Sequence, residues 1–304
     1  MIIFFHSVDL DGICSAAVVY NYMLLNFPKE ECKLYGINYG DLFPWELIKD
    51  QEVIMVDFSL TRDEMIRLQN ESKDLTWIDH HKSAINDMEG INIPGIQEVG
   101  KGACMLSWMY YHNMCKEEEV PIMVKYISDD DVWNHSNPNT WPFQYGMQLL
   151  DPDPYLLAQW LRSDKCEFIK QEVIERAIEA GQVIIKYREG SDKRYAKQAA
   201  FETSILGPEN KLYRAIAINK LQSGSELFKS VWDPDKYDIM IAFGFANGGY
   251  NFSLRSMDDG PDVSEIAKFY KGGGHPRAAG FRARDIIINK DQIFIYTELK
   301  RKEI

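Results

Sequence analysis

Positive charge is scarce in this 304-residue chain, which holds 34 Lys and Arg against 46 Asp and Glu, for a net charge of -12. A protein that grips long nucleic acid without regard to sequence normally presents a basic stripe, so that class is disfavoured. A small anionic substrate stays open, because bound divalent cations reverse the local field around clustered acids.

Cysteine pairs and long apolar runs are also missing. The five cysteines form no Cys-x-x-Cys pair and no framework spacing, which favours free thiols in a reducing cytoplasm. No stretch of about 18 apolar residues occurs, so no membrane-spanning helix is expected. Acidic residues appear by position 9 with no basic segment before them, so no signal peptide is expected.

Short apolar segments alternate with longer helical patterns in the first half of the chain. The predicted strands are residues 2–5, 33–39, 52–58 and 75–78, and the predicted helices are residues 12–27, 61–72 and 103–114. This alternation is typical of an α/β domain with a mainly parallel sheet. We therefore expect such a domain over residues 1–165.

The second half of the chain has a different organisation. It begins with a turn-rich stretch that has prolines at 138, 142, 152 and 154. The charged helical segment 166–190 is expected to connect two domains. Residues 191–304 are expected to form a smaller α+β domain, so the predicted fold class is α/β with a second α+β unit.

Acidic and imidazole side chains follow apolar segments that we interpret as strands. The residues concerned are His6, Asp9, Asp11, Asp57, Asp79, His80, His81 and the acidic run 129–131, which comes directly after the apolar segment 124–128. The carboxyl ends of parallel strands form the ligand crevice of such a sheet. These groups are therefore expected to meet at one site.

Carboxylates gathered this closely need a counter-charge, because like charges within a few ångströms raise one another's pKa values. A mixed set of Asp and His suits Mn²⁺, Mg²⁺, Co²⁺ or Zn²⁺ better than it suits soft, thiolate-seeking ions. Six ligands are too many for one catalytic ion that keeps an open position. They fit two ions about 3.5–4 Å apart, an arrangement that serves phosphoester hydrolysis.

Each motif by itself also has an ordinary structural explanation. Residues 9–12 could form a capped turn, Asp57 a helix N-cap, and residues 129–131 a solvated acidic turn. A helix C-cap would explain one of three consecutive glycines at 272–274, but not the other two and the following His275. The joint occurrence of the acidic and imidazole motifs, in order along the chain, favours the metal site.

In this combination the chain resembles the DHH phosphoesterase superfamily. The resemblance rests on Asp-Leu-Asp-Gly, the lone aspartate after Ile-Met-Val, Asp-His-His and a later aspartate, in that order. Residues 251–281 contain Gly-Gly-Gly-His and resemble the DHHA1 substrate-binding domain. Together the matching motifs run from residue 6 to residue 281.

The resemblance implies a two-metal centre. One ion would be held by His6, Asp9 and Asp57, and the other by Asp11, Asp57, His80 and Asp129, with Asp57 bridging. Mn²⁺ is the expected ion, with Mg²⁺ or Co²⁺ as alternatives, and a hydroxide shared by the two ions would attack phosphorus. His81 would face the phosphate, and Asp79 would orient the histidines. Two choices stay open. Whether His6 is a ligand is one, because exonuclease-type members dispense with this histidine, and the other is between Asp129 and its alternative, Asp131.

The resemblance also implies a phosphate clamp in the second domain. It would be formed by Arg255, Gly272, Gly273, Gly274 and His275, through charge-assisted hydrogen bonds and close backbone approach to the anion. Lys271 and Arg277 flank this loop and would add positive charge. Trp133 and Tyr250 are expected to pack in the fold, with base stacking as the alternative.

The favoured activity is hydrolysis of phosphodiester or phosphomonoester bonds in short oligonucleotides or small phosphorylated nucleotides. The glycine motif argues against the pyrophosphatase branch, and the low pI of about 5.0 argues against long-strand exonucleases. An exopolyphosphatase, a cyclic or linear dinucleotide phosphodiesterase and an inactive nucleotide-binding module are the alternatives. The substrate is the expected partner, a homodimer is a further expectation, and the expected location is the cytoplasm.

Overall fold

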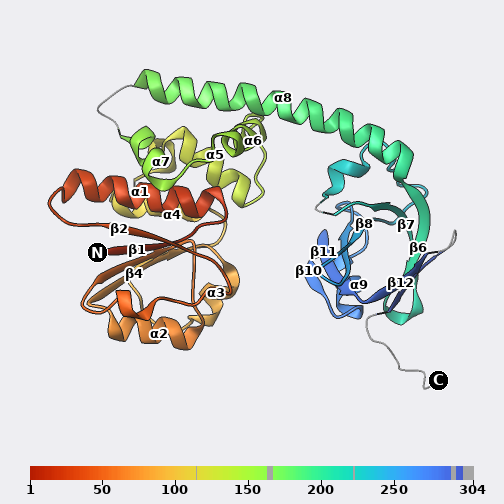
Figure 1. Ribbon diagram of the computed structural model, residues 1–304, viewed down its shortest axis with the longest axis horizontal. Coiled ribbons are helices and arrows are strands. Elements are labelled where there is room, and N and C mark those ends of the chain that lie inside the picture. The colour runs from red at the N-terminus through yellow and green to blue at the C-terminus, as the bar shows by residue number, and fades with distance from the viewer. Residues whose placement is uncertain (114, 163–166, 222, 289–291, 297–304) are drawn as a thin grey trace. The chain divides into compact units, whose positions relative to one another are not determined.

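The computed structural model describes residues 1–113, 115–162, 167–221, 223–288 and 292–296 (Figure 1). The chain divides into two compact units, Met1–Ile185 and Lys186–Ile304. Helix α8 (Glu167–Ala199) contains the division between them. Most of the predicted connector 166–190 lies in this helix, whereas the predicted boundary at 165/166 falls outside the described residues.

The first unit is built on a five-stranded sheet in the order β2-β1-β3-β4-β5. Its strands are β1 (Ile2–His6), β2 (Lys33–Ile37), β3 (Glu52–Val56), β4 (Asp74–Asp79) and β5 (Gly95–Gln97). Every pair is parallel. The central strands read as continuous apolar runs because both faces of the sheet are covered, so Ile3, Phe4, Met55 and Val56 are all buried.

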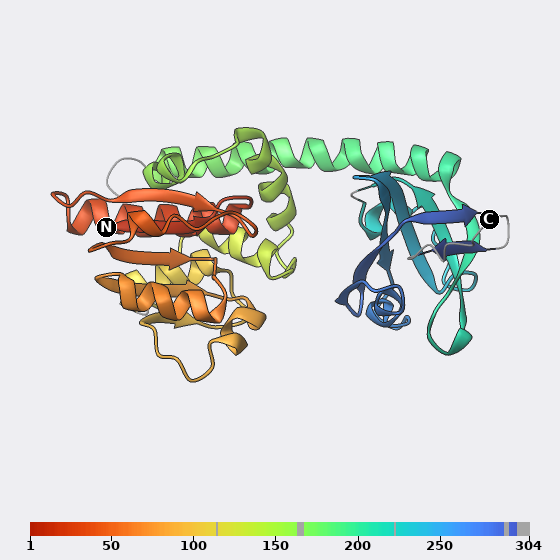
Figure 2. The ribbon, with the colours of Figure 1, turned by 60° about the horizontal axis from the view of Figure 1, so that its bottom comes forward.

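Helices cover both faces of this sheet, with α2 (Arg62–Glu71) on one face and α1 (Leu10–Asn26) and α4 (Ala103–Tyr111) on the other (Figure 2). Apolar side chains of these helices pack against those of the strands. Helices α5 (Ile122–Asp131), α6 (Thr140–Leu150) and α7 (Pro154–Leu161) pack on α1 and α4 instead of on the sheet. The first unit also contains α3 (Lys82–Asp87) and short 3₁₀ turns at Trp45–Leu47 and Glu117–Glu119. The predicted α/β fold class is confirmed.

Two predictions for the middle of the chain are wrong. The segment 124–128, which we interpreted as a strand, lies inside helix α5, where Met123, Val124 and Ile127 are buried on one helical face. The turn-rich stretch contains helices α6 and α7. Pro154 is the first residue of α7, a position where the missing N–H costs no hydrogen bond. The Asp153 side chain caps this helix by accepting from the Leu156 N–H at 2.7 Å.

The second unit contains a six-stranded mixed sheet in the order β10-β11-β9-β8-β7-β6. The strands are β6 (Phe201–Leu206), β7 (Leu212–Asn219), β8 (Ile239–Ala246), β9 (Gly249–Arg255), β10 (Gly273–His275) and β11 (Ala278–Ala283). Helix α9 (Val263–Phe269) packs on one face, and a separate ribbon pairs β12 (Asp285–Ile288) with β13 (Ile293–Tyr296). The second α+β unit is therefore confirmed.

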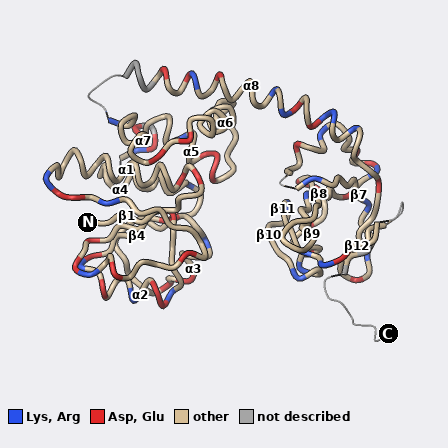
Figure 3. Tube along the Cα trace, in the orientation of Figure 1, with Lys and Arg blue, Asp and Glu red and all other residues tan. Residues whose placement is uncertain are grey.

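Helix α8 has 33 residues and is long enough to cross a bilayer by length alone. Acidic and basic residues recur along its whole course (Figure 3). Within the described ranges, no helix combines the length and the apolar character that a membrane span requires.

Candidate metal centre

The carboxyl ends of β1, β3 and β4 bring the first set of polar side chains together. His6 is the last residue of β1, Asp57 follows β3, and Asp79 is the last residue of β4. Because β3 pairs with both β1 and β4, these three strand ends are neighbours at one edge of the sheet. Asp57 has a φ of 53°, a left-handed conformation that is uncommon outside glycine and is stabilised here by its N–H bond to the Ile78 carbonyl.

The start of helix α1 supplies two more carboxylates. Asp9 is the N-cap of this helix, and its side chain accepts from the Gly12 N–H at 3.0 Å. Asp11 lies in the first turn and is only 2% exposed. Asp9 therefore acts as a helix N-cap and also belongs to the site, because one carboxylate oxygen caps the helix and the other faces His6.

The N-terminus of α4 holds Asp11 in place. The Asp11 carboxylate accepts from the Ala103 N–H at 2.6 Å and from the Cys104 N–H at 3.0 Å. A Cβ on Gly102 would lie 2.8 Å from Asp11 Oδ1, so this position requires glycine. We did not anticipate this support from the sequence, although a glycine directly before a helix without acidic residues was a usable signal for an anion at its N-terminus.

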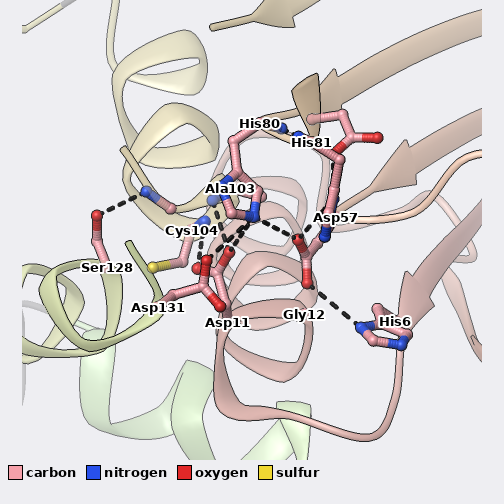
Figure 4. Close-up of polar contacts among 12 residues, drawn as sticks. His6, Asp11, Gly12, Asp57, His80, His81, Ala103, Cys104, Ser128 and Asp131 are labelled. Carbon is pink, nitrogen blue, oxygen red and sulfur yellow. Dashed lines mark hydrogen bonds and ion pairs between the residues drawn. The ribbon is translucent and has the colours of Figure 1, made fainter. Parts of the chain in front are cut away.

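Asp57 lies between two histidines, with one carboxylate oxygen towards each (Figure 4). His6 Nδ1 is 2.8 Å from Asp9 Oδ2 and 3.8 Å from Asp57 Oδ2. His80 Nε2 is 3.3 Å from Asp57 Oδ1 and 3.1 Å from Asp131 Oδ2. The ligand-capable atoms form three groups, each within 4.8 Å: His6, Asp9 and Asp57; Asp11, His80 and Asp131; Asp57, His80 and His81.

The structure brings Asp131, and not Asp129, to this cluster. Asp129 Oδ1 accepts from the Asn134 side chain at 3.1 Å, whereas the Asp131 carboxylate reaches His80. The acidic run forms the last turn of α5 instead of following a strand, so residues two apart lie about 200° apart around the helix axis. Our preference for Asp129 depended on the wrong element type, and the geometry favours the alternative, Asp131.

The donor set fits divalent metal ions. His6 Nδ1, His80 Nε2 and Asp57 Oδ1 are buried and have no hydrogen-bond partner of good geometry, although carboxylate or imidazole atoms lie within 4 Å of each. Buried polar atoms that converge without bonding to one another are expected where they share a bound ion. Oxygen and imidazole donors without thiolate suit Mn²⁺, Mg²⁺ or Co²⁺.

Ionisation in this cluster is strongly perturbed. Burial raises the pKa of Asp131 to about 6, with the Asp57 charge adding to the effect. Burial also raises the pKa of Asp11 well above its usual range. For His80 burial acts in the opposite direction, but the carboxylates of Asp57, Asp11 and Asp131 outweigh it and raise the pKa to about 9. Protons therefore supply the positive charge that a metal ion would otherwise provide.

Asp79 organises the turn that carries the two histidines. It is fully buried, and its Oδ1 accepts from the N–H groups of His80 at 2.7 Å and His81 at 3.1 Å. The same oxygen lies 2.8 Å from His81 Nδ1, and this contact raises the pKa of His81. His81 is 37% exposed and its Nδ1 lies 3.8 Å from Asp57 Oδ1, so it borders the cluster.

The predicted clamp residues of the second unit share one row of its sheet. His275 on β10 pairs with Ala278 on β11, and Ala278 pairs with Arg255 on β9. Paired residues of neighbouring strands point to the same face, and two strand spacings separate the outer pair by about 10 Å. The small residue Ala278 therefore lies between Arg255 and His275 in this row.

The three glycines of the loop have different roles. A Cβ on Gly272 would lie 2.2 Å from the Gly280 carbonyl oxygen, and Gly274 has a φ of +141° and would clash with Ala278. Gly273 faces open space, on the edge strand of the sheet. Two glycines are thus required by packing, and one leaves the backbone accessible.

Other residues singled out in the sequence have mixed outcomes. The Arg277 guanidinium donates to the Ser256 hydroxyl and to the Gly260 and Pro261 carbonyls, so it holds the loop before α9 instead of standing free beside the glycines. Tyr250 is half-buried and packs against Phe245. Trp133, which we expected to pack, is 72% exposed.

Comparison with known proteins agrees with the motif resemblance. Residues 1–128, which lie in the first unit, match the family model described as DHH family, N-terminal domain. Uncharacterized protein R106 of Acanthamoeba polyphaga mimivirus is 26% identical over 302 residues, which cover 92% of this chain and 66% of that protein. The chain thus spans slightly less than two thirds of the length of this curated relative.

Two solved structures align with this chain at low identity. A pGpG-specific phosphodiesterase, PggH, from Vibrio cholerae aligns over 92% of each chain with a TM-score of 0.52 and 12% identity. An exopolyphosphatase-related protein from Bacteroides fragilis aligns over 92% of this chain and 85% of that one, with a TM-score of 0.48 and 16% identity. At 12% identity the likeness to PggH concerns the fold alone.

Proposed function

We propose that the protein is a metal-dependent phosphoesterase that hydrolyses phosphodiester or phosphomonoester bonds of short oligonucleotides or small nucleotides. The observation that carries the proposal is Asp57, whose two oxygens face two separate groups of ligand-capable atoms. Two divalent ions bound there would polarise the phosphoryl group and lower the pKa of a bound water.

The residues of the first unit divide into two ligand sets. One ion would be held by His6, Asp9 and Asp57, and the other by Asp11, Asp57, His80 and Asp131. The contact with Asp79 raises the pKa of His81, which favours an imidazolium that would donate to a phosphoryl or leaving-group oxygen. Asp79 fixes the orientation of that ring.

The second unit would supply affinity for the substrate. Arg255 and His275 stand on either side of Ala278 in one sheet row, where both can donate to the same phosphate. The accessible backbone at Gly273 adds a donor on the edge strand. Residues of this kind recognise a terminal phosphate without reading a base.

An exopolyphosphatase is the second candidate. The sheet row of Arg255 and His275 favours any chain of phosphates as well as it favours a nucleotide. This row alone supports the candidate, because the likeness to the exopolyphosphatase-related protein, at 16% identity, concerns the fold and not the activity.

The test is a substrate panel with Mn²⁺, comparing RNA of two to five nucleotides with a 30-mer, linear and cyclic dinucleotides, phosphoadenosine phosphate and polyphosphate. We expect turnover of the short oligonucleotides or small nucleotides, with rates that fall beyond about five nucleotides because no extended basic groove is expected to hold the rest. Chelation should abolish turnover. Asp57→Asn is the negative control, and turnover that persists in that variant would exclude this centre as the active site.

A further inference from the structure

We propose that Trp133 is a stacking platform for a nucleobase of the substrate and thereby determines specificity for nucleotides over simple phosphate chains. This inference rests on the proposed phosphoester hydrolysis. It starts from the exposure of Trp133, since an indole that is 72% exposed adds little to the core of the fold.

The backbone at Trp133 is unfavourable for a bulky residue. Its φ is 60°, and it occupies the position just after the C-cap of α5, where glycine or asparagine normally provides the left-handed conformation. The Trp133 N–H bonds to the Asp130 carbonyl at 3.1 Å, so the helix end constrains this conformation. A large aromatic at such a position, without burial in return, is typical of a functional residue.

Neighbouring side chains hold the indole at one edge. The His135 ring lies 4.7 Å from the Trp133 ring at 75°, and the Trp141 ring lies 4.8 Å from His135. His135 Nε2 is in turn 3.0 Å from Asp130 Oδ1. This edge contact supports the indole and leaves it exposed to solvent over most of its surface.

The platform lies next to the candidate metal centre. Trp133 follows Asp131 by two residues, so the Cα atoms of the two residues are at most about 7 Å apart. The Asp131 carboxylate is 3.1 Å from His80 Nε2. A phosphate bound at the centre would therefore have its attached nucleoside within reach of the indole. Nucleobases stack on aromatic faces with little dependence on sequence, because every base has a π-face.

The chemistry of the surroundings favours a base over another phosphate at this position. Asp129 and Asp130 lie outside the proposed ligand sets and would repel a further anion, whereas the flat ring of a base is uncharged.

The experiment measures KM for the dinucleotide pApA and for tripolyphosphate in Trp133→Gly and Trp133→Phe. Trp133→Gly should raise the KM for pApA by about 5- to 150-fold, equivalent to about 1–3 kcal/mol of stacking, and leave the KM for tripolyphosphate unchanged. Trp133→Phe should retain most of the affinity. The Tm of Trp133→Gly should be unchanged or raised, because glycine suits the left-handed backbone. Tyr155→Ala removes another exposed aromatic of the first unit and serves as the control.

An unchanged KM for pApA in Trp133→Gly would refute the platform, and so would an equal rise for both substrates or a marked fall in Tm. To distinguish failure of the proposed hydrolysis from failure of the platform, the phosphorothioate analogue of pApA is titrated while indole fluorescence is followed. Binding that depends on Trp133 without turnover would retain the platform and reject the hydrolase.

Discussion

Asp131 is the residue at which charge and geometry in the centre are most closely linked. Its carboxylate contacts His80, and burial among other acids raises its pKa to about 6. A carboxylate that is costly to ionise without a partner is a strong ligand once a divalent ion is present.

The matched pair Asp131→Asn and Asp129→Asn tests the choice of ligand. Asp131→Asn should lower metal affinity and turnover by about two orders of magnitude or more, because it removes an anionic ligand. Asp129→Asn should stay within about threefold of the parent protein, since its carboxylate faces Asn134. Metal titration calorimetry and steady-state kinetics give both values. If Asp129→Asn lowers metal affinity and turnover more than Asp131→Asn does, Asp129 is the better candidate ligand and the placement of α5 is contradicted.

Arg255 provides the corresponding test in the second unit. Its removal should raise KM about tenfold or more with a smaller effect on kcat, because a hydrogen bond to a charged group contributes about 1.5–3 kcal/mol. Arg214→Ala is the matched control, since Arg214 is an exposed arginine of the same unit that pairs with Asp238 at 2.7 Å. If KM is unchanged in Arg255→Ala, the glycine loop is a structural turn and not a phosphate clamp.

At the scale of elements, helix α4 has a role beyond covering the sheet. Its first N–H groups hold Asp11 from a position about 90 residues away in the chain. The Gly102 N–H also donates to the Ser128 hydroxyl at 2.8 Å, so the same turn connects α4 to α5, which carries Asp131. Two proposed ligands on different helices, Asp11 and Asp131, therefore depend on one helix start.

Gly102→Ala should disturb both ligands. The new Cβ would lie 2.8 Å from Asp11 Oδ1 and 2.8 Å from the Ser128 backbone, so the helix start must shift. We expect metal affinity to fall about 10- to 100-fold, as for the loss of other groups that orient ligands. Gly190→Ala in helix α8 is the control and should keep the parent affinity, because its nearest neighbour is a flexible arginine end at 3.6 Å. Equal affinity in the two variants would show that the α4 contact is dispensable.

At the scale of the whole molecule, protons and metal ions compete for the same centre in a chain of net charge -12. The His80 pKa of about 9 means that this imidazole is protonated at neutral pH without metal, and metal binding must displace the proton. Apparent Mn²⁺ affinity should therefore rise about tenfold per pH unit per proton released and level off above pH 9. Calorimetry in buffers of different ionisation enthalpy counts the protons; no release at pH 7 would argue against His80 as a ligand.

The same shift predicts how the metal-free protein responds to pH. The folded pKa of His80 lies above its ordinary value of 6.5, so its stabilising contribution is complete below pH 6.5 and is lost as pH rises towards about 9. The Tm of chelator-treated protein should fall over this window, and the Mn²⁺-loaded protein should show a smaller fall. His80→Gln without metal should lose most of the dependence. A Tm that rises over this window would contradict the charge arrangement of the centre.

Local patterns were sufficient to predict four of the five strands of the first sheet and the polar residues at their ends, whereas the short strand β5 was not predicted. Apolar runs such as 2–5 and 52–56 have strand length and end in polar groups, and a parallel sheet brings those ends to one edge whatever the packing details. The start of α2, predicted at residue 61, is likewise a local feature, because the capping box from Thr61 to Glu64 involves neighbouring residues only. The two signatures, Asp-His-His and Gly-Gly-Gly-His, indicated the family and the glycine loop for the same reason, since each is a short contiguous run of residues.

Tertiary structure decided what depends on contacts between distant segments. The support of Asp11 by α4 joins residues about 90 positions apart, and no local pattern encodes that pairing. The choice between Asp129 and Asp131 depended on whether residues 124–128 form a strand or a helix, and short apolar runs fit both until the neighbouring helices bury one face. The exposure of Trp133 was equally invisible in the sequence, because burial is a property of the folded surface and not of residue type.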